Sequence, residues 1–201
     1  MLCTLEQIQQ RLGVTSLSAE DSAVLTGLLA SVTAMAEQYC HRGLVLPEEP
    51  VTEVYTGGTP YLRLRAFPVA DLQEIRIAAD GDFDSAEPLG ASEYRLLQFG
   101  RSGIVYRVDL PWPAEPPDSI QVVYRGGFVP AGESPADPAE TPMPADLQES
   151  AVEQVVFLFK RRDDIGLSGV SFQGGSFSKF EQVDLLPQVK RIWDLYQRIV
   201  L

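Results

Sequence analysis

The sequence is poor in the side chains on which most active sites and metal sites depend. Its 201 residues include one histidine, His41, and two cysteines, Cys3 and Cys40. Zinc takes about four cysteine or histidine ligands, so one chain cannot complete such a site. Cys40 and His41 are adjacent, and adjacent side chains on a helix point in different directions, which disfavours a catalytic pair. The sequence therefore predicts no catalytic residue, metal or cofactor. Cys3 and Cys40 could pair in principle, but buried or idle thiols are favoured.

Short motifs that resemble functional loops are incomplete. The alternating acids of residues 80–84 begin like a calcium-binding EF-hand loop, but the sixth position is Ser85 and the twelfth is Ala91. Residues 173–179 are glycine-rich but lack the Gly-Lys-Ser/Thr ending of a phosphate-binding loop. We expect a solvated turn at the first site and a flexible linker at the second. The basic triplet 160–162 is followed at once by two acids, which favours a capped helix end over a nucleic-acid site.

Long hydrophobic runs and excess positive charge are also lacking. No apolar run approaches the roughly 20 residues of a membrane-spanning helix, and the first residues lack the pattern of a signal peptide. Acidic residues outnumber basic ones by 28 to 16, which gives a formal net charge of −12. Such a charge repels a phosphate backbone. We expect a cytosolic chain whose surface suits DNA that slides past without being held.

Apolar residues at helical spacing predict four helices. Thr4 and Gln7 form a capping-box pattern at the start of the first. Pro187 lies in the first turn of the last, where proline is tolerated. The predicted helices begin at Thr4, Ser18, about Ala145 and about Leu186, and end near Gly13, Gly43, Asp163 and the last residue.

Residues 51–129 alternate short β-branched and aromatic runs with turn residues, which predicts a small antiparallel β module. Residues 56–60 are expected to join its first two strands as a hairpin. The proline-rich residues 130–142 predict a stiff, extended connector. The fold class is α+β: a helical bundle of residues 1–50 and 143–201 with the inserted β module. The predicted strands are Thr52–Tyr55, Tyr61–Leu64, Leu72–Ile77, Tyr94–Leu97, Ile104–Arg107 and Ile120–Arg125.

Aromatic residues occur where polar ones are expected. Phe172, Phe177 and Phe180 lie in a glycine- and serine-rich segment. They fit docking onto another surface and packing onto the chain's own core equally well.

The order of these elements resembles the head–tail connector, or adaptor, proteins of tailed phages and gene transfer agents. The likeness covers nearly the whole chain and depends on order and spacing rather than on one motif. It is carried by residues 4–8 and the helix ending at 36–42; by 62–64, 67–69 and 75–77; by 122–128, 143–147 and 160–162; and by 174–178, 185–187 and the final helix.

The resemblance implies a structural virion protein and not an enzyme. Family members form rings, typically of twelve copies, below the portal of the filled head. They extend the DNA channel and offer a platform to the stopper or tail-side neck proteins. The resemblance thus implies a place in the virion neck after assembly in the host cytoplasm, with DNA passing unbound and no membrane contact.

Specific residues follow from this implied role. Phe172, Phe177, Phe180, Trp193 and Tyr196 become candidates for contact with the portal or a neighbouring subunit. The acid-rich residues 80–93 or 133–149 become candidates for the border of the channel.

Two alternatives remain open. Another neck component, such as a stopper or tail-completion protein, is usually smaller and mainly β, which four helices disfavour. A ligand-binding or enzymatic domain on the β module requires a pocket with clustered polar groups. A single histidine also limits its acid–base chemistry.

Overall fold

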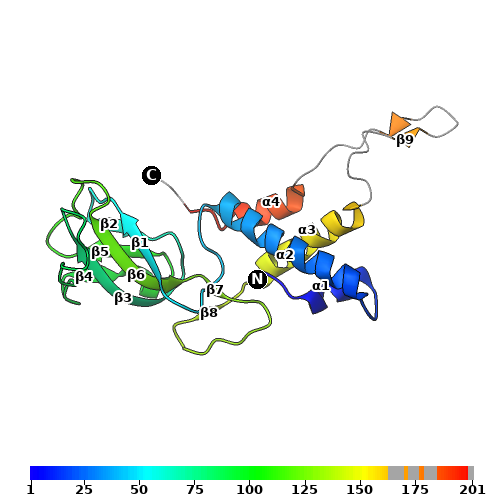
Figure 1. The fold of residues 1–201 in the computed structure, drawn as a ribbon, viewed down its shortest axis with the longest axis horizontal. Helices are drawn as coiled ribbons and strands as arrows, with labels where there is room; N and C mark the ends of the chain where they lie inside the picture. The colour runs from blue at the N-terminus through cyan, green and yellow to red at the C-terminus, as the bar shows by residue number, and fades with distance from the viewer. Residues whose placement is uncertain (163–169, 172–176, 179–184, 199–201) are drawn as a thin grey trace. The chain divides into compact units, whose positions relative to one another are not determined.

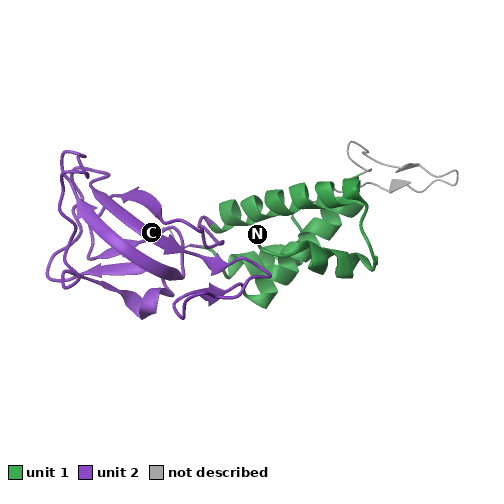
Figure 2. Ribbon diagram, turned by 60° about the horizontal axis from the view of Figure 1, so that its bottom comes forward, with its two compact units in different colours: residues 1–40, 144–197 green, residues 41–143, 198–201 purple. Residues whose placement is uncertain are grey.

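The computed structural model describes residues 1–162, 170–171, 177–178 and 185–198 (Figure 1). The chain divides into two compact units (Figure 2). Unit 1 comprises Met1–Cys40 and Pro144–Gln197, and unit 2 comprises His41–Met143 and Arg198–Leu201. Helices and antiparallel sheets are both present, so the predicted α+β class is confirmed.

Unit 1 is built from helices. Helix α3 contacts each of the other three. The predicted capping box is confirmed, because the Thr4 N–H donates to Gln7 Oε1 at 2.8 Å and Thr4 Oγ1 accepts from the Gln7 N–H at 3.2 Å. The helices are α1 (Leu5–Leu12), α2 (Ala19–Cys40), α3 (Ala145–Lys160) and α4 (Pro187–Asp194).

The long helix α2 buries one stripe of side chains. These are Leu25, Leu29, Val32, Ala36 and Cys40, spaced three or four residues apart as one helix face requires. The helix ends at Cys40 rather than near Gly43, because His41 has a φ of 53° and leaves the helical region. The prediction of buried thiols is confirmed for Cys3 and Cys40.

The prediction that the last helix reaches the end of the chain is wrong. Helix α4 ends at Asp194, and the Leu195 N–H donates to the carbonyl of Ile192 in a tighter final turn. The third helix also ends early, at Lys160 rather than near Asp163. Pro187 does occupy the first turn of α4, as predicted.

Unit 2 contains two three-stranded antiparallel sheets, with strand orders β1-β6-β3 and β2-β5-β4, and a short parallel pair of β7 and β8. Buried residues of both sheets share one core, including Ile75, Val105, Ile120 and Tyr124. The elements are β1 (Val51–Tyr55), β2 (Tyr61–Arg63), β3 (Val69–Ile77), β4 (Tyr94–Leu96), the 3₁₀ helix η1 (Leu97–Gly100), β5 (Ile104–Arg107), β6 (Ile120–Gly126), β7 (Phe128–Val129) and β8 (Thr141–Pro142).

The predicted hairpin at residues 56–60 is wrong. Strand β1 pairs with β6 and β2 pairs with β5, so these residues connect two sheets. The Gly57 and Gly58 N–H groups donate to the carbonyls of Pro113 and Trp112, at 2.9 and 2.8 Å. These bonds hold residues 56–60 against the loop that precedes β6. The residues therefore do not form a tight turn.

Residues 130–140 contain two turns, and only residues 141–142 of the predicted connector are extended, as strand β8. The Glu133 N–H donates to the Pro130 carbonyl at 3.1 Å, and the Glu140 N–H donates to the Asp137 carbonyl at 3.0 Å. Proline fixes φ but also suits the second position of a turn, which Pro138 occupies here. The Glu140 carboxylate pairs with Arg125 of β6 at 3.3 Å, which holds the loop to the sheet.

Candidate interaction surfaces

Trp193 is a core residue of unit 1. Its side chain is fully buried, its ring centroid lies 5.9 Å from that of Tyr39, and its Nε1–H donates to Ser150 Oγ at 3.1 Å. A side chain without exposed surface cannot contact a partner. The prediction that Trp193 lies at an interface is therefore wrong. An apolar stripe in the sequence does not reveal which of its members face outward.

Tyr196 lies in the turn after α4 and is partly exposed. Its hydroxyl donates to Asp146 Oδ1 at 2.7 Å, which links this turn to the start of α3. The preceding Leu195 keeps 75% of its surface exposed. Sequence reasoning missed Leu195, because its exposure depends on how α4 packs against the other helices.

The three phenylalanines that are candidates for contact with a partner lie in a part of the chain where the structure describes few residues. Phe172 and Phe180 are outside the described residues. Phe177 belongs to β10 (Phe177–Ser178), which pairs antiparallel with β9 (Val170–Ser171). The sequence predicted a linker here and not a strand pair.

Two arginines of the basic triplet at the end of α3 make contacts within unit 1. The Arg162 guanidinium lies 3.9 Å from the centroid of the Phe159 ring and forms a 3.2 Å ion pair with Asp21. The Arg161 guanidinium lies 5.2 Å from the centroid of the Phe157 ring. These contacts support the interpretation of the triplet as a helix end.

A polar cluster crosses the core of unit 2. The Tyr124 hydroxyl donates to Glu53 Oε2 at 2.7 Å and accepts from the Ala66 N–H at 2.9 Å. The Tyr55 hydroxyl also donates to Glu53. Burial raises the pKa of Tyr124 to about 12 and raises that of Tyr55 as well. Both phenols therefore stay protonated at neutral pH, and the cluster holds the chain after β2 in place.

The outer face of the sheet β2-β5-β4 carries aromatic and cationic side chains. Leu62 of β2 and Val105 of β5 point into the core. Strand alternation therefore directs their neighbours outward. Tyr61 is 52% exposed, and its ring centroid lies 5.5 Å from that of Tyr106. The outward residues are Tyr61, Arg63, Arg95, Ile104 and Tyr106, which we call the Tyr/Arg face.

The arginines of the Tyr/Arg face are not neutralised by nearby acids. Within the described part of the chain, neither Arg63 nor Arg95 forms an ion pair. At the β2 edge, Arg198 Nη2 donates to the Arg63 carbonyl at 2.8 Å and adds a third cation. Sequence reasoning missed this face, because the pairing of β2, β5 and β4 was not predicted.

Phe99 is the most exposed large apolar residue described, at 99%. It lies in η1, and both Phe99 and Gln98 have φ values of 52°. Bulky residues rarely adopt this left-handed conformation. A phenylalanine held there in water is a second exposed aromatic feature that sequence reasoning missed.

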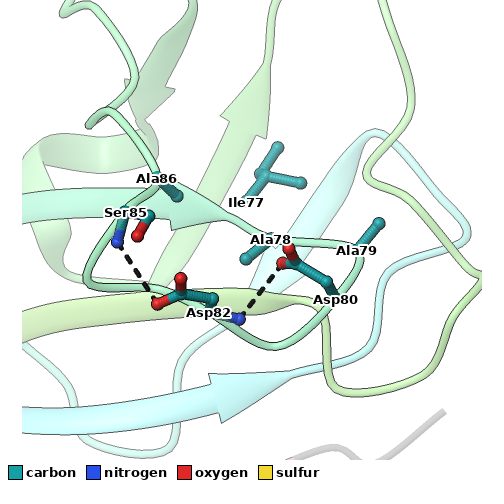
Figure 3. A pocket seen from close by; sticks show the side chains of 7 residues that line it. All are labelled: Ile77, Ala78, Ala79, Asp80, Asp82, Ser85 and Ala86. Atoms are coloured by element: carbon teal, nitrogen blue, oxygen red, sulfur yellow. Dashed lines mark hydrogen bonds between the residues drawn. The ribbon is translucent and has the colours of Figure 1, made fainter.

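Residues 80–86 form a shallow acidic turn (Figure 3). The Asp82 N–H donates to Asp80 Oδ1 at 3.1 Å, and the Ser85 N–H donates to Asp82 Oδ1 at 3.4 Å. Hydrogen bonds from Ser85 lower the pKa of Asp82. The predicted solvated turn is confirmed, because Asp80, Asp82 and Asp84 are exposed. The hollow of about 330 Å³ beside them is lined mainly by alanine, serine and these acids.

Among the residues that the structure describes, no group of three or more histidine, cysteine or acidic side chains is arranged to hold a metal ion. None of the helices described is long and apolar enough to cross a bilayer.

Comparison with known proteins shows a likeness in fold. No protein family matches the sequence, and no curated protein matches it. A chain from the neck of an empty gene transfer agent (GTA) particle, computed with C6 symmetry, aligns with a TM-score of 0.61 at 14% identity, over 98% of this chain and 89% of that one. A chain from the neck of a native GTA particle, computed with C12 symmetry, aligns with a TM-score of 0.53 at 16% identity, over 89% of this chain and 84% of that one.

Proposed function

We propose that this chain is a structural subunit of the head–tail neck of a tailed phage or gene transfer agent. The observation that carries the proposal is the fold match to a GTA neck chain over 98% of this chain and 89% of the other. A match of that extent includes the helices of unit 1 and the sheets of unit 2. It therefore depends on the whole order of elements and not on a common motif.

Within the neck, we assign the chain to the adaptor ring below the portal. The C6 and C12 symmetries of the two matched particle necks support a ring of identical copies. A twelve-membered ring extends the DNA channel and gives the stopper or tail-side proteins a surface on which to assemble. The net charge of −12 suits this role, because it disfavours lasting contact with DNA phosphates. The role requires no catalytic residue.

For contact with the portal, we propose the turn after α4 and residues 168–180. Leu195 and Tyr196 supply apolar and phenolic surface in the turn. Phe172, Phe177 and Phe180 supply three aromatic rings in the other segment. Aromatic residues are over-represented among those that dominate binding energy at protein interfaces.

Electron microscopy of the purified chain, alone and mixed with its portal protein, tests the proposal. We expect rings stacked below the portal. A chain that stays monomeric and ignores the portal would contradict the proposal and favour a ligand-binding role. A ring that binds tail-side proteins but not the portal would indicate another neck component.

Deletion of residues 168–180 tests the portal contact separately. We expect unchanged circular dichroism and loss of portal binding. The matched control is deletion of residues 133–139, an exposed loop of unit 2, which should leave portal binding intact. Portal binding that survives the first deletion would exclude this segment as the contact.

A further inference from the structure

We propose that the Tyr/Arg face of one copy binds the acidic segment 80–93 of a second copy of this chain. The inference rests on the proposed ring and assigns the contact between its neighbouring subunits. It starts from two exposed surfaces of opposite charge that unit 2 presents in different places.

The Tyr/Arg face has the composition of a protein-binding surface. Tyr61 of β2, Tyr106 of β5 and Arg95 of β4 lie in one cross-strand row, since Tyr106 pairs with both of the others. Arg63 and Ile104 form the next outward row. Tyrosine and arginine are the residue types that most often dominate interface energies. None of the five residues that define this face is acidic, and within the described residues neither Arg63 nor Arg95 forms an ion pair.

The partner that fits this face carries carboxylates. Arginine binds carboxylate groups through two parallel hydrogen bonds, and a phenol hydroxyl can donate a third. Residues 80–93 contain Asp80, Asp82, Asp84, Glu87 and Glu93 and no basic residue. All five acids are exposed.

The acidic segment is held in shape before any partner binds. Arg76 Nη1 donates to the Phe83 carbonyl at 2.8 Å, which ties the turn to β3. The Leu89 N–H donates to the Ile75 carbonyl at 2.8 Å, which attaches the following residues to the same strand. A carboxylate surface that is already ordered loses less conformational entropy on binding.

The acidic turn of residues 80–86 and the Tyr/Arg face are attached to different sheets, whereas Glu93 at the end of the segment directly precedes β4 and accepts from the Val108 N–H. The acidic turn is attached to β3 in the sheet β1-β6-β3, and the Tyr/Arg face lies on the sheet β2-β5-β4. A contact between two different surfaces of the same chain is head-to-tail, and repeating it closes a ring when the rotation permits. This is the kind of contact that cyclic symmetry requires.

Nucleic acid is the competing partner, because aromatic and arginine side chains also bind single strands. The net negative charge of unit 2 disfavours nucleic-acid binding. Residues 41–143 carry 16 acidic and 8 basic residues, and this excess repels phosphates at long range.

A charge-swap experiment tests the contact. Arg95→Glu and Asp84→Arg should each raise the protein concentration needed for half-maximal ring assembly by roughly tenfold or more, because each reversal places like charges opposite one another. The double variant should recover much of the loss. Lys190→Glu, an equal charge change at an exposed position of α4, is the control and should leave assembly unchanged. Assembly is measured by light scattering and electron microscopy, with and without portal.

Disulfide trapping provides a second readout that does not depend on affinity. The double variant Arg95→Cys/Asp84→Cys places one cysteine on each proposed surface. The native Cys3 and Cys40 are buried, so the introduced cysteines are the exposed ones. Under oxidising conditions we expect a ladder of covalent oligomers that disappears with reductant. Each single variant should yield no more than dimers.

The outcomes separate this inference from the proposed function. Rings that form normally with Arg95→Glu and give no disulfide ladder overturn the inference and leave the neck role standing. A wild-type chain that forms no ring even with portal overturns both. Loss of single-stranded DNA binding by Arg95→Glu, with assembly unchanged, would make the face a nucleic-acid site and overturn the inference.

Discussion

At the scale of single residues, Trp193 shows how one side chain can stabilise a unit. It is fully buried beside α3 and donates a hydrogen bond to Ser150. We expect Trp193→Ala to lower the free energy of unfolding by about 3–5 kcal/mol, because truncation leaves a large cavity. Urea denaturation followed by circular dichroism measures the change.

Trp193→Phe is the matched control, since it keeps an aromatic ring and removes only the N–H donor. It should cost less than the alanine variant, although Ser150 Oγ then loses this partner. If Trp193→Ala keeps wild-type stability and only weakens portal binding, Trp193 is an interface residue after all.

The buried tyrosine of the polar cluster predicts a loss of stability in alkaline solution. Burial raises the pKa of Tyr124 from 10.0 to about 12. The folded state therefore holds the phenol proton more tightly than the unfolded state does. This contribution is complete below pH 10 and is lost as the pH rises through about 12.

Urea denaturation at pH 9, 10 and 11 should show the free energy of unfolding falling across this range. Tyr124→Phe removes the titrating group and should flatten that part of the profile, at the cost of the bond from the Ala66 N–H. Tyr55 and Cys3 also have a raised pKa, so some decline should remain. An identical slope in wild type and variant would show that Tyr124 does not contribute.

At the scale of elements, the connection between β1 and β2 depends on glycine. A Cβ on Gly57 would lie 2.5 Å from the Trp112 Cβ and from the Pro113 carbonyl oxygen. Gly57→Ala should therefore separate the connection from the loop before β6. We expect a loss of about 1–3 kcal/mol, the usual cost of overpacking, measurable as a lower midpoint in thermal unfolding.

Gly81→Ala offers a comparison in an open turn of the same unit. A Cβ there has no neighbour within 4 Å, although its φ of 79° carries a local backbone cost. Gly57→Ala should be the more destabilising of the two. The reverse order would mean that the contact with Trp112 is less tight than the structure indicates.

At the scale of the whole molecule, the proposed adaptor role predicts that charge controls how DNA passes. If residues 80–93 contact the neighbouring subunit, residues 133–149 remain the candidate acidic border of the channel. Glu133→Lys replaces an exposed acid with a cation that attracts phosphates, so we expect slower DNA ejection at low salt and a smaller effect at high salt.

Glu133→Gln is the control, since it removes the negative charge without adding a positive one. It should change the ejection rate less than the lysine variant. Equal ejection rates for wild type and Glu133→Lys in assembled particles would place this loop away from the DNA.

Local features of the fold could be predicted from the sequence. Thr4 and Gln7 satisfy backbone groups within one turn, and the α2 stripe and the strands near Tyr61 and Ile104 depend on neighbouring residues alone. These features could therefore be recognised from short stretches of sequence. The hairpin at 56–60 was not predictable, because a distant partner, the loop at Trp112 and Pro113, takes the hydrogen bonds of its glycines.

The same distinction applies to the candidate surfaces. Composition by itself determined the acidic character of the chain and its shortage of catalytic and metal-binding side chains, since charge and residue counts do not depend on folding. Only the tertiary structure decided that Trp193 is buried while Leu195 is exposed, and that Tyr61, Tyr106 and Arg95 share one face. The physical reason is that burial and cross-strand pairing arise from contacts between residues far apart in the sequence.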